Sequence, residues 1–221
     1  MTSYCGAGAR VGLIEALLLA DDRRLEALLQ EGGLPAQVPN NGSALNFART
    51  TYAIERLIEL GAPIDATDRW GRTPMASISA LGLKGRPLVW HLVGCGVAAT
   101  AVDYARIGDR DNIPEESCAE PAVIVAAVEF GHQELVEWLL DQGADPNARS
   151  SERSRQTALH IAAWNGSLAL AKMLVEAGAD IAALDEEHSS TPRGWAETAI
   201  TVKNNPLCRE VAEYLAGLEA A

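Results

Sequence analysis

The fold is decided by a phrase that occurs twice in the second half of the chain. Residues 134–148 read ELVEWLLDQGADPNA and residues 170–183 read LAKMLVEAGADIAA, so an amphipathic run ends in Gly-Ala-Asp both times. The two glycines, Gly143 and Gly178, are 35 residues apart. A phrase that recurs at an interval of roughly 20 to 50 residues is typical of a stacked repeat architecture. The pattern therefore predicts a solenoid.

Weaker copies of both ends of the repeat extend through the rest of the chain. The closing phrase recurs as IERLIELGAPIDA at 54–66, as a looser LEALLQEG at 25–32 and as a still looser LVWHLVGCG at 88–96. A second phrase opens the units, and it reads DRWGRTPM at 68–75, QTALHIAA at 156–163 and STP at 190–192. The repeat therefore covers nearly the whole sequence.

These two phrases resemble the ankyrin repeat, which has a period of about 33 residues, the signature T-P-L-H-x-A and two antiparallel helices after a β-turn. In the clearest unit, Thr157 opens the first helix, Gly166 closes it and Gly178 closes the second helix. The physical roles of these residues agree with the resemblance. Thr caps a helix start, Pro fixes φ in the first turn, and Gly ends a helix in the left-handed conformation.

The resemblance implies an all-α helical solenoid that forms a single domain over residues 1–221, with about six helix-turn-helix repeats and short β-turn or hairpin connections. The repeats are expected near residues 11–40, 43–68, 73–99, 122–150, 157–185 and 191–218. The second unit is short, which predicts a tighter turn between its helices. The largest departure is an insertion at about 100–121, expected to be a loop rich in Asp and Glu. A tolerated surface insertion and a functional extension both fit this segment.

Composition limits the function classes that need to be considered. The 221 residues carry 18 basic and 30 acidic groups, a formal net charge of −12. Nucleic-acid binding depends on Lys and Arg that displace counterions, so we expect no nucleic-acid partner. No window approaches the roughly 20 uncharged apolar residues of a membrane span. The 38 alanines fit closely packed helices, because Ala is the best helix former and is small.

The cysteines and the first apolar run point to the same compartment. Cys5, Cys95, Cys118 and Cys208 lie far apart with no C-x-x-C pair, so we expect four reduced thiols and no zinc site. The apolar run 11–20 is interrupted by Glu15 and lacks a small-residue cleavage site, which favours an amphipathic helix over a signal peptide. The chain is expected to be a cytoplasmic monomer.

No pattern predicts an enzyme, a cofactor or a metal. The chain has neither a G-x-S-x-G nor an H-E-x-x-H motif, and its four histidines fall in different units. In the ankyrin family, His at the positions of His132 and His160 bonds neighbouring turns, so we expect structural roles for both. His188 is expected in an exposed turn, without a partner.

By resemblance, a partner would contact the turn tips and the exposed end of each first helix. The candidate binding residues at these positions are Arg69, Trp70, Arg72, Leu81, Glu129, Phe130, Arg153, Trp164, Asn165 and His188. Trp70, Phe130 and Trp164 are scarce aromatics, and such rings with Arg are the usual interface anchors. The alternative is that each ring folds back onto its neighbouring turn. Trp195 is expected in the core of the last unit, and Trp90 and Trp138 on second helices.

Three functions from different classes follow. The first is a non-enzymatic protein–protein interaction module that binds one protein through the concave face of the stack. The second is a microbial immunity or inhibitor protein, whose acidic surface would occlude the basic site of a toxin or enzyme. The third, a remote alternative, is an enzyme with a pocket under the insertion at 100–121.

Overall fold

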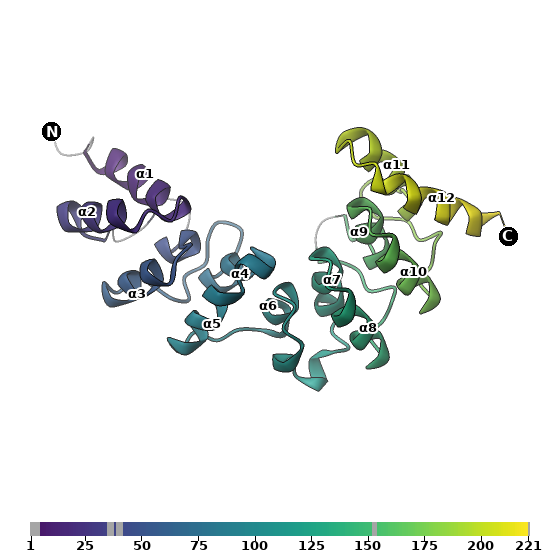
Figure 1. Cartoon of the computed structure of the whole chain (residues 1–221), viewed down its shortest axis with the longest axis horizontal. Coiled ribbons are helices and arrows are strands. Elements are labelled where there is room, and N and C mark those ends of the chain that lie inside the picture. Colours follow the sequence, from purple (N-terminus) through teal and green to yellow (C-terminus); the bar gives the residue numbers. More distant parts are fainter. Residues whose placement is uncertain (1–4, 35–37, 39–41, 152–153, 221) are drawn as a thin grey trace. The chain divides into compact units, whose positions relative to one another are not determined.

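The computed structural model describes residues 5–34, 38, 42–151 and 154–220, with backbone only at 5–10. It divides into two compact units, Met1–Asp103 and Tyr104–Ala221. The described residues form helices and turns, and their β-pairing is limited to one isolated bridge between Arg149 and Thr157. The all-α architecture that the repeat predicts is therefore confirmed (Figure 1). The placement of the six repeats within one domain stays a prediction.

The first unit consists of paired helices in two layers. Its elements are α1 (Cys5–Leu18), α2 (Asp22–Gly32), η1 (Ala44–Phe47), α3 (Thr51–Glu59), α4 (Pro74–Ser79), η2 (Gly82–Lys84) and α5 (Arg86–Gly94). The 3₁₀ helix η1 contacts both α1 and α4, and α3 contacts both α2 and α5. First helices therefore stack on first helices, and second helices on second helices.

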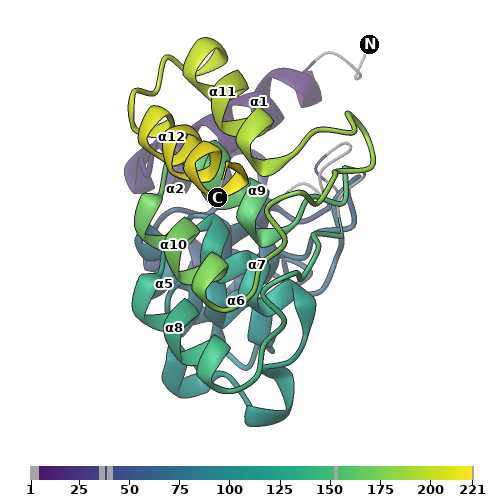
Figure 2. The same ribbon diagram turned by 90° about the vertical axis from the view of Figure 1, so that its right-hand side faces the viewer.

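The second unit repeats this arrangement. Its elements are α6 (Ala101–Arg106, which begins at the boundary), η3 (Arg110–Asn112), η4 (Glu115–Ser117), α7 (Pro121–Glu129), α8 (Gln133–Asp141), α9 (Ala158–Asn165), α10 (Leu168–Glu176), α11 (Pro192–Val202) and α12 (Leu207–Glu219). Helix α9 contacts α7 and α11, and α10 contacts α8 and α12. Figure 2 shows the two resulting columns side by side.

The two layers differ in how much of each helix is buried. Helix α8 is amphipathic, because Leu135, Val136 and Leu139 are buried while Glu134 and Glu137 are exposed. By contrast, every residue of 123–128 in α7 and of 158–163 in α9 is buried. A first helix lies between two neighbouring first helices and its own second helix. Small residues such as Ala allow this close approach on several sides.

The expected helix caps are present. The side-chain hydroxyls of Thr73, Thr157 and Thr191 each accept a hydrogen bond from the backbone N–H three residues later. Gly166 ends α9 with φ +71°, and a Cβ there would lie 2.9 Å from the Cβ of Leu207. Only Gly fits both the left-handed backbone and this close approach of the first turn of α12.

Side chains near the starts of first helices bond one repeat to the next. His160 Nδ1 lies 3.2 Å from the Thr157 backbone nitrogen, and His160 Nε2 lies 2.9 Å from the Ser190 carbonyl oxygen. Burial lowers the pKa of His160, so the imidazole is neutral at pH 7. His132 likewise reaches the Arg106 carbonyl oxygen at 2.8 Å. The structural roles predicted for His132 and His160 are confirmed.

Asn46 takes the histidine position in the second repeat. Its Oδ1 accepts from the Ser43 backbone N–H at 3.3 Å, and its Nδ2 donates to Ser77 Oγ at 2.9 Å and to the Arg72 carbonyl at 3.3 Å. The first helix of this short repeat is reduced to the 3₁₀ turn η1, and Thr50 caps α3 directly after it. The repeat is therefore shortened in its first helix as well as in its turn.

The insertion at 100–121 contains more regular structure than the predicted loop, since it holds α6, η3 and η4. Asp103 Oδ2 accepts from the Thr100 backbone N–H at 2.9 Å and from its hydroxyl at 2.7 Å, and Ser79 Oγ bonds Asp103 Oδ1 at 2.6 Å. Asp103 and Asp109 are both buried. Asp103 therefore holds the backbone of this segment in place, and Asp109 accepts from the Asn112 side-chain amide at 3.3 Å.

Two smaller expectations can also be compared with the structure. Cys95, Cys118 and Cys208 are free thiols as predicted, and Cys5 lies where side chains are not described. None of the described helices has the length and apolar character needed to cross a membrane.

The role of Asn46 predicts a stability change. Asn46→Ala leaves the buried backbone N–H of Ser43 without its acceptor and removes the bonds that the amide donates to Ser77 Oγ and to the Arg72 carbonyl, which keeps the Asp68 N–H. An unpaired buried polar group costs about 1–3 kcal/mol. Urea unfolding followed by circular dichroism should therefore show a lower free energy of unfolding by about that amount. Gln142→Ala removes an exposed amide and should change it by less than about 0.5 kcal/mol. Equal losses in the two variants would contradict the role of Asn46.

Candidate partner-binding surface

Trp70 is the most exposed of the three predicted aromatic anchors, Trp70, Phe130 and Trp164. Its side chain lies on the turn before α4 and the residue is 59% exposed. The guanidinium carbon of Arg69 is 3.9 Å from the ring centroid and that of Arg72 is 4.8 Å away. The structure thus brings Arg69, Trp70 and Arg72 together as one exposed group of cation–π contacts.

Asp68 holds the backbone of this turn. Its buried carboxylate accepts the backbone N–H groups of Trp70 and Arg72, each at 2.9 Å, and also the Arg72 Nε at 2.9 Å. Burial alone would raise the pKa of Asp68, but the hydrogen bonds from Arg72 and Trp70 outweigh burial and lower it. Trp70 is therefore presented by an ordered turn. Leu81 lies half-buried directly before η2.

In the second unit, the predicted residues on α7 and α9 lie partly against their neighbours. Phe130 is half-buried and stacks on His132 with ring centroids 6.5 Å apart. Asn165 donates through Nδ2 to the Glu129 carbonyl at 3.2 Å, and both residues are exposed. The Phe130 ring thus lies against His132, which directly precedes α8.

Trp164 and His188 line a pocket of about 340 Å³ together with Ser190, Trp195 and Thr198. Trp164 comes from the end of α9, and Trp195 and Thr198 come from α11. The two indole rings meet edge to face, with centroids 5.4 Å apart and an interplanar angle of 69°. Lys203 Nζ lies 4.6 Å from the centroid of the Trp164 ring.

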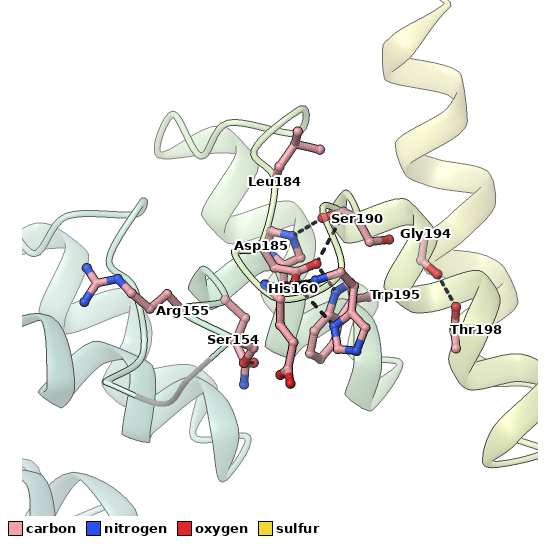
Figure 3. A network of polar contacts seen from close by, with 12 residues as sticks. Ser154, Arg155, His160, Leu184, Asp185, Ser190, Gly194, Trp195 and Thr198 are labelled. Carbon is pink, nitrogen blue, oxygen red and sulfur yellow. Dashed lines mark hydrogen bonds and ion pairs between the residues drawn. The ribbon is translucent and has the colours of Figure 1, made fainter.

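A buried carboxylate fixes the wall of this pocket. Asp185 has no exposed side-chain surface. Its carboxylate accepts the backbone N–H groups of Glu187, His188 and Ser190 at 2.7–3.0 Å, and the Trp195 indole N–H at 2.9 Å. Figure 3 shows the Asp185 carboxylate facing Trp195 and Ser190, with His160 beside them.

The charge of Asp185 is stabilised by these donors. Burial alone would raise its pKa, but the hydrogen bonds from the Trp195 side chain and from the backbone of His188, Ser190 and Glu187 outweigh it. The pKa of Asp185 consequently lies far below its usual range. The carboxylate is ionised at pH 7 and holds the 185–190 turn and the Trp195 ring in one arrangement.

Two predictions about single residues need correction. The sequence places Trp195 in the core, but the residue is half-buried and lines the pocket, because its ring meets Trp164 and His188, which are themselves half-buried and exposed. His188 was expected without a partner, but its Nδ1 lies 3.4 Å from Asp185 Oδ1 and its ring meets the edge of Trp195 at 6.2 Å.

Sequence reasoning missed Asp185, Thr198 and Lys203. A signal for Asp185 exists, since Asp68 also stands shortly before a Thr-Pro pair and also binds the turn backbone. Arg153, a predicted binding residue, lies outside the described residues, and Trp90 and Trp138 lie on the second helices α5 and α8 as expected. Within the described residues, no cluster of three or more His, Cys, Asp or Glu side chains could hold a metal ion.

The Asp185 cluster predicts a stability change with a defined pH dependence. Asp185→Asn removes a buried charge that four N–H groups bind, so the free energy of unfolding at pH 7 should fall by about 2–4 kcal/mol. The folded-state pKa lies below the unfolded value of about 3.9, so the stabilisation is complete above that pH. At lower pH the wild-type advantage should shrink by about 1.4 kcal/mol per pH unit.

The measurement is urea unfolding of both proteins between pH 7 and pH 2.5. Asp180→Asn is the matched control, because Asp180 is an exposed turn residue whose carboxylate accepts one backbone N–H, from Ala182 at 2.9 Å. It should cost less than about 1 kcal/mol. A stability difference for Asp185→Asn that stays constant over this pH range would contradict the ionised, buried carboxylate.

Comparison with known proteins agrees with the repeat architecture. The model of the family "Ankyrin repeats (many copies)" matches residues 124–175. The mouse inactive serine/threonine-protein kinase TEX14 is 40% identical over 80 residues, which cover 36% of this chain and 5% of that protein. The human SH3 and multiple ankyrin repeat domains protein 2 is 32% identical over 168 residues, 76% of this chain and 8% of that protein.

A solved structure matches over more of the chain. The human ASB11 ankyrin repeat domain superimposes with a TM-score of 0.56 at 19% identity, covering 88% of this chain and 98% of its own. At that identity the likeness shows the fold alone, and the curated relatives named above are matched over only 5–8% of their lengths. Together with the repeat phrases and the stacked helix pairs, these matches show that the chain is an ankyrin repeat protein, with the fold of a general protein–protein interaction module.

Proposed function

We propose that the protein is a non-enzymatic module that binds a protein partner through its turn tips and first helices. The observation that carries the proposal is Trp70. A Trp residue that is 59% exposed gives up hydrophobic burial that a folded chain ordinarily uses, and here the ring is flanked by Arg69 and Arg72. Trp and Arg are the side chains most enriched among the energetically dominant residues of protein interfaces.

The order of the Trp70 turn supports the same proposal. Asp68 bonds the backbone on both sides of the turn tip, so the indole is presented by a fixed main chain. A side chain that is already ordered loses less conformational entropy when a partner binds. The Trp70 turn therefore has both the composition and the order of an interface anchor.

The polar groups of the chain support a non-enzymatic function. His160 and His132 each bond a backbone carbonyl of another turn, and Asp185 accepts four N–H groups that belong to its own fold. A general acid or base must instead face a reacting group in a cleft. These titratable residues are occupied by structural bonds, which fits a scaffold that presents its surface to another protein.

The proposal is tested with a partner isolated by affinity purification from the native cells and identified by mass spectrometry. Calorimetric titration should then show that Trp70→Ala weakens binding by about 30-fold, which corresponds to the roughly 2 kcal/mol lost at an interface anchor. Trp164→Ala should also weaken binding, by a smaller factor, because that ring is less exposed.

Trp90→Ala is the matched control. Trp90 is 39% exposed on α5, a second helix, so its removal changes exposed aromatic surface away from the turn tips. Circular dichroism establishes that each variant is folded. Unchanged affinity of folded Trp70→Ala and Trp164→Ala, or an equal loss in Trp90→Ala, would sink the proposed surface.

A further inference from the structure

We propose that the pocket formed by Trp164, His188, Ser190, Trp195 and Thr198 receives one aromatic side chain of a partner peptide, and that an acidic residue next to it faces Lys203. The inference deepens the proposed function, because it rests on the protein binding another protein and names the chemistry of one contact. The size, walls and charge of the pocket each support it.

The size of the pocket suits one large side chain. Ligand pockets usually measure about 300–1,000 Å³, and this one, at about 340 Å³, lies at the lower end of that range. Its largest lining groups are two indole rings that meet edge to face. An incoming ring can continue this pattern, because aromatic pairs favour edge-to-face and offset-stacked contacts.

The walls of the pocket are held in place before any ligand arrives. The Trp195 ring meets three rings edge to face, with ring centroids 5.8 Å from His160, 5.4 Å from Trp164 and 6.2 Å from His188. Its indole N–H also donates a hydrogen bond to Asp185. A wall fixed on several sides loses little entropy on binding, so a single inserted ring can contribute measurable affinity.

The charges around the pocket disfavour a cationic ligand. Two Trp rings near a carboxylate would otherwise suggest a cage for an ammonium or guanidinium group. Asp185, however, is fully buried and already accepts four N–H groups. Lys203 Nζ lies 4.6 Å from the Trp164 ring centroid and occupies the cation–π position at that wall. A second cation there would be repelled.

Lys203 favours an acidic neighbour for the inserted ring. It is exposed and forms no ion pair within the described part of the chain, whereas Glu197 on α11 lies 3.3 Å from Arg193, which also pairs with Glu219 at 2.6 Å. An aromatic residue beside Asp or Glu therefore fits both the pocket and its rim.

The inference is tested with the full chain labelled with ¹⁵N, whose five Trp side chains each give an indole N–H signal. The probes are the capped dipeptides acetyl-Asp-Phe-amide, acetyl-Asp-Ala-amide, acetyl-Lys-Phe-amide and acetyl-Asp-Lys-amide. Acetyl-Asp-Phe-amide should shift the signals of Trp164 and Trp195 in a saturable manner and leave that of Trp70 unchanged. Acetyl-Asp-Ala-amide and acetyl-Asp-Lys-amide should bind at least about 10-fold more weakly, and acetyl-Lys-Phe-amide about 3- to 5-fold more weakly.

Two variants separate the pocket from its rim. Thr198→Trp places a large side chain at an exposed lining position and should abolish the saturable shifts while the circular dichroism spectrum stays that of the wild type. Lys203→Glu should remove the preference for acetyl-Asp-Phe-amide over acetyl-Lys-Phe-amide. Lys84→Glu makes the same charge change at an exposed residue that does not line the pocket, and should preserve the preference.

The outcomes distinguish this inference from the proposed function. The inference is overturned if acetyl-Asp-Phe-amide leaves both indole signals unchanged, or if acetyl-Asp-Lys-amide binds as tightly as acetyl-Asp-Phe-amide. It is also overturned if folded Thr198→Trp binds acetyl-Asp-Phe-amide as the wild type does. In each of those cases a partner whose affinity still depends on Trp70 would leave the proposed function standing. If Trp70→Ala leaves the affinity for the partner unchanged while acetyl-Asp-Phe-amide still binds, the proposed binding surface at Trp70 is overturned and the pocket contact stands.

Discussion

The structure depends on hydrogen bonds between neighbouring repeats. In each case a side chain at the start of the first helix of one repeat bonds the turn that precedes the first helix of the following repeat. A repeat of two short helices cannot bury its apolar faces alone, so it must be stacked in a fixed register on its neighbours. His160 supplies that register by joining Thr157 to the Ser190 carbonyl, and Asn46 supplies it by joining Ser43 to Arg72 and Ser77. Imidazole and amide differ in shape, but each offers one acceptor and one donor in the required directions.

The same constraint produces the candidate binding surface. A turn whose backbone N–H groups are bound by a buried carboxylate can expose its tip and stay ordered. Asp68 and Asp185 both bind their turns in this way. In one unit the ordered tip presents Trp70 between two Arg side chains, and in the other it closes one side of a pocket against Trp164 and Trp195. The stability of the stack and the geometry of its surface therefore have a common cause.

Most of the fold could be predicted because its signals are local. Thr157, Gly166 and Gly178 mark helix ends by backbone chemistry that depends little on distant residues. The placement of side chains was harder to predict, since it depends on partners far along the chain. Trp195 stands at a position typical of a core residue, but its ring lies beside Trp164 and His188 and lines a pocket, while Asp185, ten residues earlier, binds its indole N–H. Asp103 belongs to the segment that the sequence predicts as an acid-rich loop, and the sequence does not show that Ser79 and Thr100 bind it.

The net charge of −12 is a poor guide to what the surface can bind. Charges more than about 8–10 Å apart are largely screened at physiological ionic strength, so a ligand responds to the groups closest to it. Several carboxylates are buried or paired within the fold: Asp68 with Arg72, Asp185 with backbone N–H groups, and Glu197 with Arg193. These carboxylates are bound by donors of the fold itself, whereas Arg69 and Lys203 extend over exposed or half-exposed indole rings. An acidic protein can therefore present positive, aromatic contact points, and a partner with acidic and aromatic residues is compatible with the chain as a whole.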